Sequence, residues 1–341
     1  MEFLYEYGMF VAKALTIVLA ILVVVVGIIL SLTKSKEERE EHIEIKKLND
    51  KYDDIKFSMQ SFMSNKDELK TLEKAHKAKL KAEKKSPKDS ERKRIFVVDF
   101  DGDIKASAVS DLREEVTAIL MVARKQDEVF VRLQSPGGMV NTYGLAASQL
   151  TRIKDNNLSL TIAVDKVAAS GGYMMACVAD KIIAAPFAIL GSIGVVAQIP
   201  NFNRVLKKHD VDYEIITAGE YKRTLTMLGE NTEQGRTKFK EDIEDIHVLF
   251  KDFVENHRPV VDIAKVSTGE FWFGTRAKEL ALVDELKTSD DYLLEQVNEI
   301  DLYSVKHVEK KKLSDKFSGF LQNVSENVIT GWWSKSRENS L

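Results

Sequence analysis

Residues 159–186, SLTIAVDKVAASGGYMMACVADKIIAAP, contain the pattern that decides the fold. Two short apolar runs, 159–164 and 181–185, are separated by a glycine-containing turn and a segment of helical character that runs toward Val178. Buried strands separated by a helix are typical of an α/β domain with a largely parallel sheet. The stretch therefore predicts a strand, a turn, a helix and a second strand in succession.

The same alternation of strands and helices continues on both sides of this stretch, from about residue 94 to about residue 303. It predicts an α/β core over 94–303. A second run, 182–200, has nineteen residues without charge, but Pro186, Gly191 and Gly194 would break a helix, so it is expected to form two short strands around a turn. Further strands are expected at 95–100, 128–133 and 213–217, and helices at 110–123, 142–154 and 233–255.

Overall composition excludes some classes of partner. The 341 residues include 50 basic and 53 acidic side chains, which gives a net charge of -3 and no general field that would attract nucleic acid. The single cysteine, Cys177, cannot form an internal disulfide, so it gives no indication of the compartment.

An uncharged and mostly aliphatic run covers residues 14–32, between Lys13 and Lys34. As a helix it would be roughly 28 Å long, about the thickness of a bilayer's hydrocarbon core. The run has no polar face, and no small-residue cleavage pattern follows it. We therefore expect residues 1–33 to form a transmembrane anchor, rather than a soluble helix or a cleaved signal peptide. Basic residues after the span favour a cytoplasmic main domain, but interleaved glutamates leave the side open.

The segment 34–93 is expected to be a charged helical stalk followed by a basic linker. No Pro or Gly occurs between Thr33 and Lys85, and apolar residues recur at alternating spacings of three and four. This stripe predicts one helix of about 50 residues, roughly 75 Å long, which either associates with another copy or docks on its own domain. The stripe consists of Ile45, Leu48, Tyr52, Ile55, Met59, Phe62 and Leu69.

The C-terminal segment, 304–341, is expected to hold an amphipathic helix. It would pack on its own domain, on a neighbouring subunit or at a membrane interface. Its apolar face consists of Leu313, Phe317, Leu321, Val324, Val328 and Trp332.

Three glycine-rich turns in the core each follow an expected strand, where an α/β sheet usually presents its functional groups. In the first turn the proline fixes the backbone and the two glycines let N–H groups approach a ligand, which suits an oxyanion hole; a plain tight turn is the alternative. The turns are Ser135-Pro136-Gly137-Gly138, Ala169-Ser170-Gly171-Gly172-Tyr173 and Gly191-Ser192-Ile193-Gly194.

Ser170 lies between small residues at the expected start of a helix, where a nucleophile would be accessible; an ordinary N-cap is the alternative. None of the six histidines lies near the glycine turns, so a lysine is the more plausible base. Lys222 follows an expected strand and Gly219, and a lysine buried against apolar walls can lose its proton near neutral pH. A surface lysine is the alternative, and Lys166 is a poorer candidate because it would lie at the edge of the Ser170 turn.

Taken together, the Ala-Ser-Gly-Gly-Tyr turn, the Gly-Ser-Ile-Gly turn and Tyr221-Lys222-Arg223 resemble the signal peptide peptidase (SppA-type) family of serine proteases, in its SohB branch, over nearly the full chain. The resemblance implies that Ser170 is the nucleophile, Lys222 the general base and Ser192 the residue that orients the lysine. It also implies that the backbone N–H groups of Gly138 and Gly171 hold the oxyanion.

The fold implied by this resemblance is the ClpP/crotonase type. ClpP proteases carry a histidine about two dozen residues after their serine, whereas this chain has Val195 there. In the family, rings of subunits can pair the serine of one protomer with the lysine of its neighbour.

The expected function is hydrolysis of membrane-associated peptides, such as signal peptide remnants or misfolded segments, by a homo-oligomeric endopeptidase. We expect a single-pass protein of the bacterial inner membrane, anchored through 14–32, with no cofactor, metal or nucleic acid. Two alternatives stay open: a crotonase-type acyl-thioester enzyme, and a membrane-anchored oligomeric scaffold whose site is vestigial.

Overall fold

The computed structural model describes residues 7–21, 41–85 and 92–309. The chain divides into two compact units, one of 1–42 with 308–341 and one of 43–307. In the first unit, residues 7–21 are helical and exposed. Among the residues described, no helix has the length and apolar character needed to cross a bilayer. The predicted span continues into 22–32, outside the described residues, and so does the predicted C-terminal helix.

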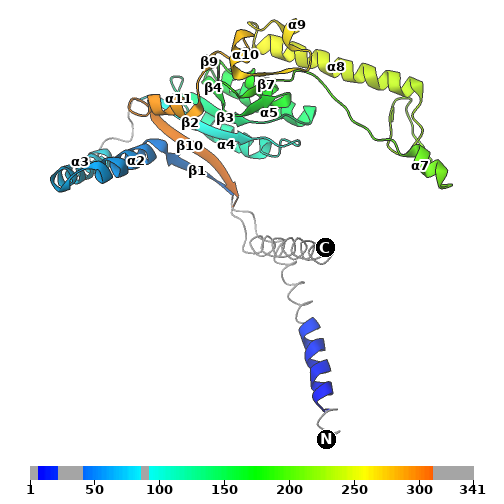
Figure 1. The fold of residues 1–341 in the computed structure, drawn as a ribbon, viewed down its shortest axis with the longest axis horizontal. Helices are drawn as coiled ribbons and strands as arrows, with labels where there is room; N and C mark the ends of the chain where they lie inside the picture. The colour runs from blue at the N-terminus through cyan, green and yellow to red at the C-terminus, as the bar shows by residue number, and fades with distance from the viewer. Residues whose placement is uncertain (1–6, 22–40, 86–91, 310–341) are drawn as a thin grey trace, which may run out of the picture. The chain divides into compact units, whose positions relative to one another are not determined.

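A seven-stranded sheet forms the centre of the larger unit (Figure 1). Its strand order is β1-β10-β2-β3-β4-β6-β9, and every pair from β10 to β9 is parallel. The predicted α/β class with buried parallel strands is therefore confirmed. The strands are β1 (Glu41–Lys47), β2 (Arg94–Asp101), β3 (Glu128–Gln134), β4 (Ser159–Val164), β6 (Lys181–Ala184), β9 (Glu285–Leu286) and β10 (Asp301–Glu309).

Alternating side chains of the sheet enter two hydrophobic cores. On β2, Phe96 and Val98 belong to the larger core, whereas Ile95 and Val97 belong to the smaller one. Burial on both faces explains why these strands are continuously apolar. The larger core is closed by α4 (Val109–Val122), α5 (Val140–Asp155) and α6 (Gly171–Ala176), and the smaller by α11 (Ser289–Gln296) and the start of α2 (Leu48–Met63).

A second, three-stranded sheet has the order β5-β7-β8. Its strands β5 and β7 are parallel, and β8 runs antiparallel to β7. A bridge between Ser135 and Ala168 joins this sheet to the end of β3. The strands are β5 (Val167–Ala169), β7 (Ile189–Gly191) and β8 (Phe271–Phe273), followed by α10 (Gly274–Glu279).

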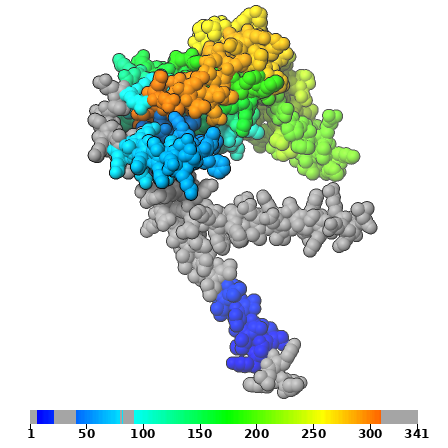
Figure 2. Space-filling model, turned by 60° about the vertical axis from the view of Figure 1, so that its left-hand side comes forward, coloured from blue at the N-terminus to red at the C-terminus, as the bar shows by residue number. Residues whose placement is uncertain are grey.

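After β7 the chain leaves the core as a projecting segment, residues 195–231, which we call the arm (Figures 1 and 2). It contains α7 (Asn203–Lys208) and returns through α8 (Glu233–His257), which leads to α9 (Ile263–Val266). The predicted strand at 213–217 is wrong, and so is the second of the two strands expected within 182–200. The arm bonds to itself rather than to a sheet; for example, the Phe202 N–H donates to the Met227 carbonyl at 2.7 Å.

The predicted continuous stalk helix is also wrong. Residues 41–47 form β1, and the helical part is a hairpin of α2 and α3 (Lys66–Lys85). A capping box separates the two helices: Asn65 Oδ1 accepts from the Glu68 N–H at 3.0 Å, and the Glu68 carboxylate accepts from the Asn65 N–H at 3.0 Å. These bonds satisfy N–H groups at the start of a new helix, so the apolar stripe continues across a break.

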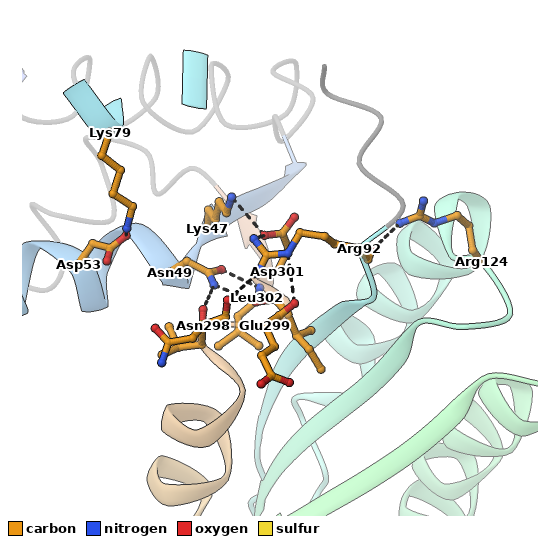
Figure 3. A network of polar contacts seen from close by, with 12 residues as sticks. Lys47, Asn49, Asp53, Lys79, Arg92, Arg124, Asn298, Glu299, Asp301 and Leu302 are labelled. Carbon is orange, nitrogen blue, oxygen red and sulfur yellow. Dashed lines mark hydrogen bonds and ion pairs between the residues drawn. The ribbon is translucent and has the colours of Figure 1, made fainter. Parts of the chain in front are cut away.

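The base of the hairpin docks on the core through Asn49 (Figure 3). Asn49 Nδ2 donates to the carbonyls of Val297 and Ile300 at 2.7 and 2.9 Å, and its Oδ1 accepts from the Leu302 N–H at 2.8 Å. Leu48 and Tyr52 of the predicted stripe therefore pack on their own domain. Ile45, Ile55, Met59 and Phe62 of the same stripe are exposed.

Candidate active site

Ser170 lies at a strained turn between β5 and α6. Its backbone has φ 52° and ψ -119°, a conformation that costs a non-glycine residue on the order of 1–3 kcal/mol. Hydrogen bonds hold it there, because the Ser170 N–H donates to the Gly191 carbonyl at 2.8 Å and its carbonyl accepts from the Met174 N–H at 3.0 Å. The side chain is half-buried at the end of a strand, as a sharp strand-to-helix turn requires.

Ser192 follows the neighbouring strand. Because Ala169 pairs with Gly191 in the parallel register of β5 and β7, the next residues, Ser170 and Ser192, lie side by side at the strand ends. Ser192 also has a positive φ of 51°, and its N–H donates to the Glu270 carbonyl at 2.7 Å. The structure thus brings together two of the residues predicted for the site.

The Gly137-Gly138 turn packs directly against Ser170. Gly137 has φ +87°, and a Cβ at this position would lie 2.8 Å from both Ser170 Cβ and Gly171 N. A Cβ at Gly138 would lie 2.1 Å from the Ile104 carbonyl oxygen. Only glycine fits at either position, because both clashes involve backbone atoms.

The two predicted oxyanion donors are backbone N–H groups that are free of hydrogen bonds in the described part of the chain. Within 41–85 and 92–309, no hydrogen bond has the Gly138 N–H or the Gly171 N–H as its donor. Gly138 is exposed, and Gly171 is buried as the first residue of α6. Free backbone N–H groups beside a serine hydroxyl are the arrangement that stabilises a tetrahedral oxyanion.

Lys222 lies on the arm, apart from this cluster. It is exposed, and its N–H donates to the Gly219 carbonyl at 3.2 Å in a tight turn. Its neighbour Tyr221 contacts the first turns of α8, where Lys238 Nζ lies 5.8 Å from the tyrosine ring centroid.

The part of α8 that packs into the core is distant from that contact. Phe250 and Val254 enter the larger core together with residues of α6. Phe250 follows Lys238 by twelve residues, a helical rise of roughly 18 Å. Within one chain the arm therefore holds Lys222 away from Ser170. The strand predicted at 213–217, which was expected to place Lys222 beside Ser170, is absent.

Two hydroxyl residues beside the glycine turns had no predicted role. Ser135 and Tyr143 are both completely buried, and their oxygens lie 2.6 Å apart. No motif marks Tyr143. One signal could have indicated it: Tyr143 lies in the first turn of α5, and at that spacing a side chain points back toward the Gly137-Gly138 turn.

Comparison with known proteins adds a family assignment. The model of "Peptidase family S49 N-terminal" matches residues 2–150, and that of "Peptidase family S49" matches residues 152–302. A "Probable protease SohB" of Haemophilus influenzae is 49% identical over 350 residues, which cover 100% of this chain and 99% of that protein.

A "Probable protease SohB" of Buchnera aphidicola subsp. Acyrthosiphon pisum is 45% identical over 330 residues, covering 96% of this chain and 97% of that protein. Among solved structures, a mutant of the "1510-N membrane-bound stomatin-specific protease" aligns with a TM-score of 0.41 and 12% identity, over 61% of this chain and 86% of that chain.

Proposed function

Because the chain belongs to peptidase family S49, a family of proteases, we propose that it is a serine endopeptidase with Ser170 as nucleophile and Lys222 as general base. One observation carries the serine assignment: the strained Ser170 turn packs against the Gly137-Gly138 turn, and within the described residues the N–H groups of Gly138 and Gly171 donate no hydrogen bond. A merely structural N-cap serine needs no such neighbours, and Ser170 makes no side-chain cap bond.

The mechanism follows the general chemistry of an activated serine. The neutral Lys222 amine takes the Ser170 proton as the hydroxyl oxygen attacks the peptide carbonyl. The N–H groups of Gly138 and Gly171 stabilise the resulting oxyanion, and the lysine returns the proton to the leaving amine. Water, deprotonated by the same lysine, then releases the acyl-enzyme. Ser192, beside Ser170, would orient the lysine.

We further propose that the dyad forms between two subunits. Lys222 is exposed on the arm, and its neighbour Tyr221 contacts α8 at Lys238, roughly 18 Å along the helix from the core residue Phe250. The same arm exposes large apolar side chains, among them Ile216 at 94% and Val196 at 81% of their surface. Such a surface favours a protein partner, and a second copy would bury Lys222 at the serine of its neighbour.

Residues 14–32 would anchor these subunits in the bacterial inner membrane. Their apolar character is the support for this part of the proposal, since a helix of that length matches the bilayer core. A protease held at the bilayer meets peptides that remain there, so signal peptide remnants and misfolded membrane segments are the proposed substrates.

The test uses full-length protein in detergent with a fluorogenic peptide and a serine-directed phosphonate. Ser170→Ala and Lys222→Ala should each abolish turnover, and Ser170→Ala should abolish labelling. Lys166→Ala is the matched control, because Lys166 is an exposed lysine four residues before the serine. Turnover retained by either dyad variant would exclude the assignment, and loss only in Lys166→Ala would move the base to that residue.

Mixing the two inactive variants tests the subunit arrangement. If the dyad forms between subunits, oligomers assembled from Ser170→Ala and Lys222→Ala chains contain some sites with both residues, and part of the activity returns. Mixed oligomers, verified by two affinity tags, that remain inactive would place the dyad within one chain.

A further inference from the structure

A chain of hydrogen bonds connects the glycine turn to the loop after β2. The Gly137 N–H donates to Ser135 Oγ at 3.1 Å, and the Tyr143 hydroxyl donates to the Asp103 carbonyl at 2.7 Å. Because Tyr143 has only one hydroxyl proton, Ser135 is the donor in the 2.6 Å bond between the two hydroxyls. The series runs in one direction from backbone N–H to backbone carbonyl, so each bond polarises the next.

The loop at the end of this hydrogen-bond series, which contains Asp103 and Ile104, packs against Gly138. The Met139 N–H donates to the Ile104 carbonyl at 2.9 Å, directly after Gly138. The Ile104 carbonyl oxygen also lies only 2.1 Å from the position that a Cβ of Gly138 would occupy. Fixing the carbonyl of Asp103, the preceding residue, therefore fixes the surface against which Gly138 is placed. The Gly137 N–H already donates to Ser135 Oγ, so the Gly138 N–H is the donor of this turn that is available to a ligand.

The ring of Tyr143 reaches the other oxyanion donor. A Cβ at Gly171 would lie 2.4 Å from Tyr143 Cγ, so the ring is in close contact with the Gly171 backbone. Burial raises the pKa of the Tyr143 phenol above its ordinary value, which keeps the hydroxyl protonated as a donor. One side chain thus contacts the backbone of Gly171 and, through its hydroxyl, the turn that carries Gly138.

We propose that Tyr143, acting with Ser135, is a positioning residue that sets the spacing between the Gly138 and Gly171 N–H groups. This inference rests on the proposed function, because it concerns the oxyanion hole of that reaction. Ground-state substrate binding depends little on this spacing, whereas stabilisation of the tetrahedral intermediate depends on it strongly. The hydroxyl pair should therefore affect kcat and leave KM nearly unchanged.

The experiment measures kcat and KM of full-length Tyr143→Phe and Ser135→Ala with the fluorogenic peptide, together with the inhibition constant of a peptide boronate. A boronate forms a tetrahedral adduct with a serine and so reports the oxyanion hole. We expect kcat to fall about 10- to 100-fold in each variant, with KM changed less than about threefold. The boronate should bind more weakly by a similar factor. The double variant should lose little more than either single variant, because both break one chain.

Tyr292→Phe is the matched control. Its phenol is also buried and donates to Glu128 Oε1 at 2.6 Å, but Glu128 begins β3, at the opposite strand end from Ser135. This variant should lose thermal stability yet keep kcat within about twofold. Ser135→Ala keeps the experiment decisive if Tyr143→Phe does not fold.

Each outcome separates the two proposals. If wild type turns over, Ser170→Ala does not, and Ser135→Ala and Tyr143→Phe keep kcat within about twofold, the positioning role alone is wrong. If kcat falls equally in Tyr143→Phe and Tyr292→Phe, the loss is one of general stability and the positioning role is again wrong. Wild-type protein without Ser170-dependent turnover would overturn the proposed function, and the positioning role with it.

Discussion

Replacing Glu115 by glutamine should remove a large pH dependence of folding stability. Glu115 is a buried residue of α4, and only 4% of its surface is exposed. Burial, with smaller contributions from the nearby carboxylates of Asp111 and Asp99, raises the pKa of its carboxyl from 4.5 to about 7. The His307 N–H, which donates to Glu115 Oε1 at 2.8 Å, opposes these effects without cancelling them.

The sign follows from proton binding. Between pH 4.5 and about 7 the folded protein holds a proton on Glu115 that the unfolded chain has released, so the free energy of unfolding falls as pH rises through this window. The full difference corresponds to about 3–4 kcal/mol, at about 1.4 kcal/mol per pKa unit. Stabilisation from the protonated carboxyl is fully present below pH 4.5 and is lost above pH 7. From pH 5 to pH 8, about 2–3 kcal/mol should be lost.

The assay is urea unfolding of wild type, Glu115→Gln and Glu114→Gln at pH 5, 6, 7 and 8. Glutamine keeps the shape of the side chain and an oxygen that can accept from the His307 N–H. Glu115→Gln should therefore gain about 2–3 kcal/mol relative to wild type as the pH rises from 5 to 8. Glu114→Gln removes an exposed carboxylate of the same helix and should follow wild type. Parallel curves for wild type and Glu115→Gln would refute a protonated Glu115 in the folded state.

Two further predictions concern buried groups outside the site. Asn49→Ala removes three hydrogen bonds at the base of the hairpin and should lower the free energy of unfolding by about 2–4 kcal/mol. The control Asn298→Ala changes an exposed residue and should stay within about 0.5 kcal/mol of wild type. Equal urea midpoints for the two variants would contradict this. Burial raises the pKa of the Cys177 thiol, so a thiol-reactive disulfide reagent should modify native protein at least about 100-fold more slowly than urea-unfolded protein; comparable rates would contradict this.

Local pattern was sufficient for several elements of the core. The strand predicted at 159–164 is β4 without change, and the helix predicted at 142–154 is α5 with two residues added at the start and one at the end. These elements have one or two buried faces, so the spacing of their apolar residues records their structure directly. The break between α2 and α3 was also readable, because Asn65 and Glu68 form a capping box. A long apolar stripe obscured that local signal.

The arm was beyond the reach of local pattern. Residues 213–217, YEIIT, include the aromatic and β-branched side chains that are common in strands. A strand also requires a partner, and the segment has none in the described part of the sheets. Several apolar residues there are exposed in the single chain, including Ile216 and Tyr213. Their apolar character cannot record burial within the chain, so the usual inference from hydrophobicity to strand fails.

The same distinction explains why the serine side of the candidate site could be predicted and the lysine could not be placed. The turns that carry Gly138, Ser170 and Ser192 all follow strands that pair with one another or bridge, so parallel topology alone brings them to one edge. Lys222 follows a segment outside both sheets, and no rule of sheet topology fixes its position. A base supplied by a second subunit, as proposed above, would leave this separation in a single chain: Ser170 and Ser192 beside the glycine turn, and an exposed lysine on an apolar arm.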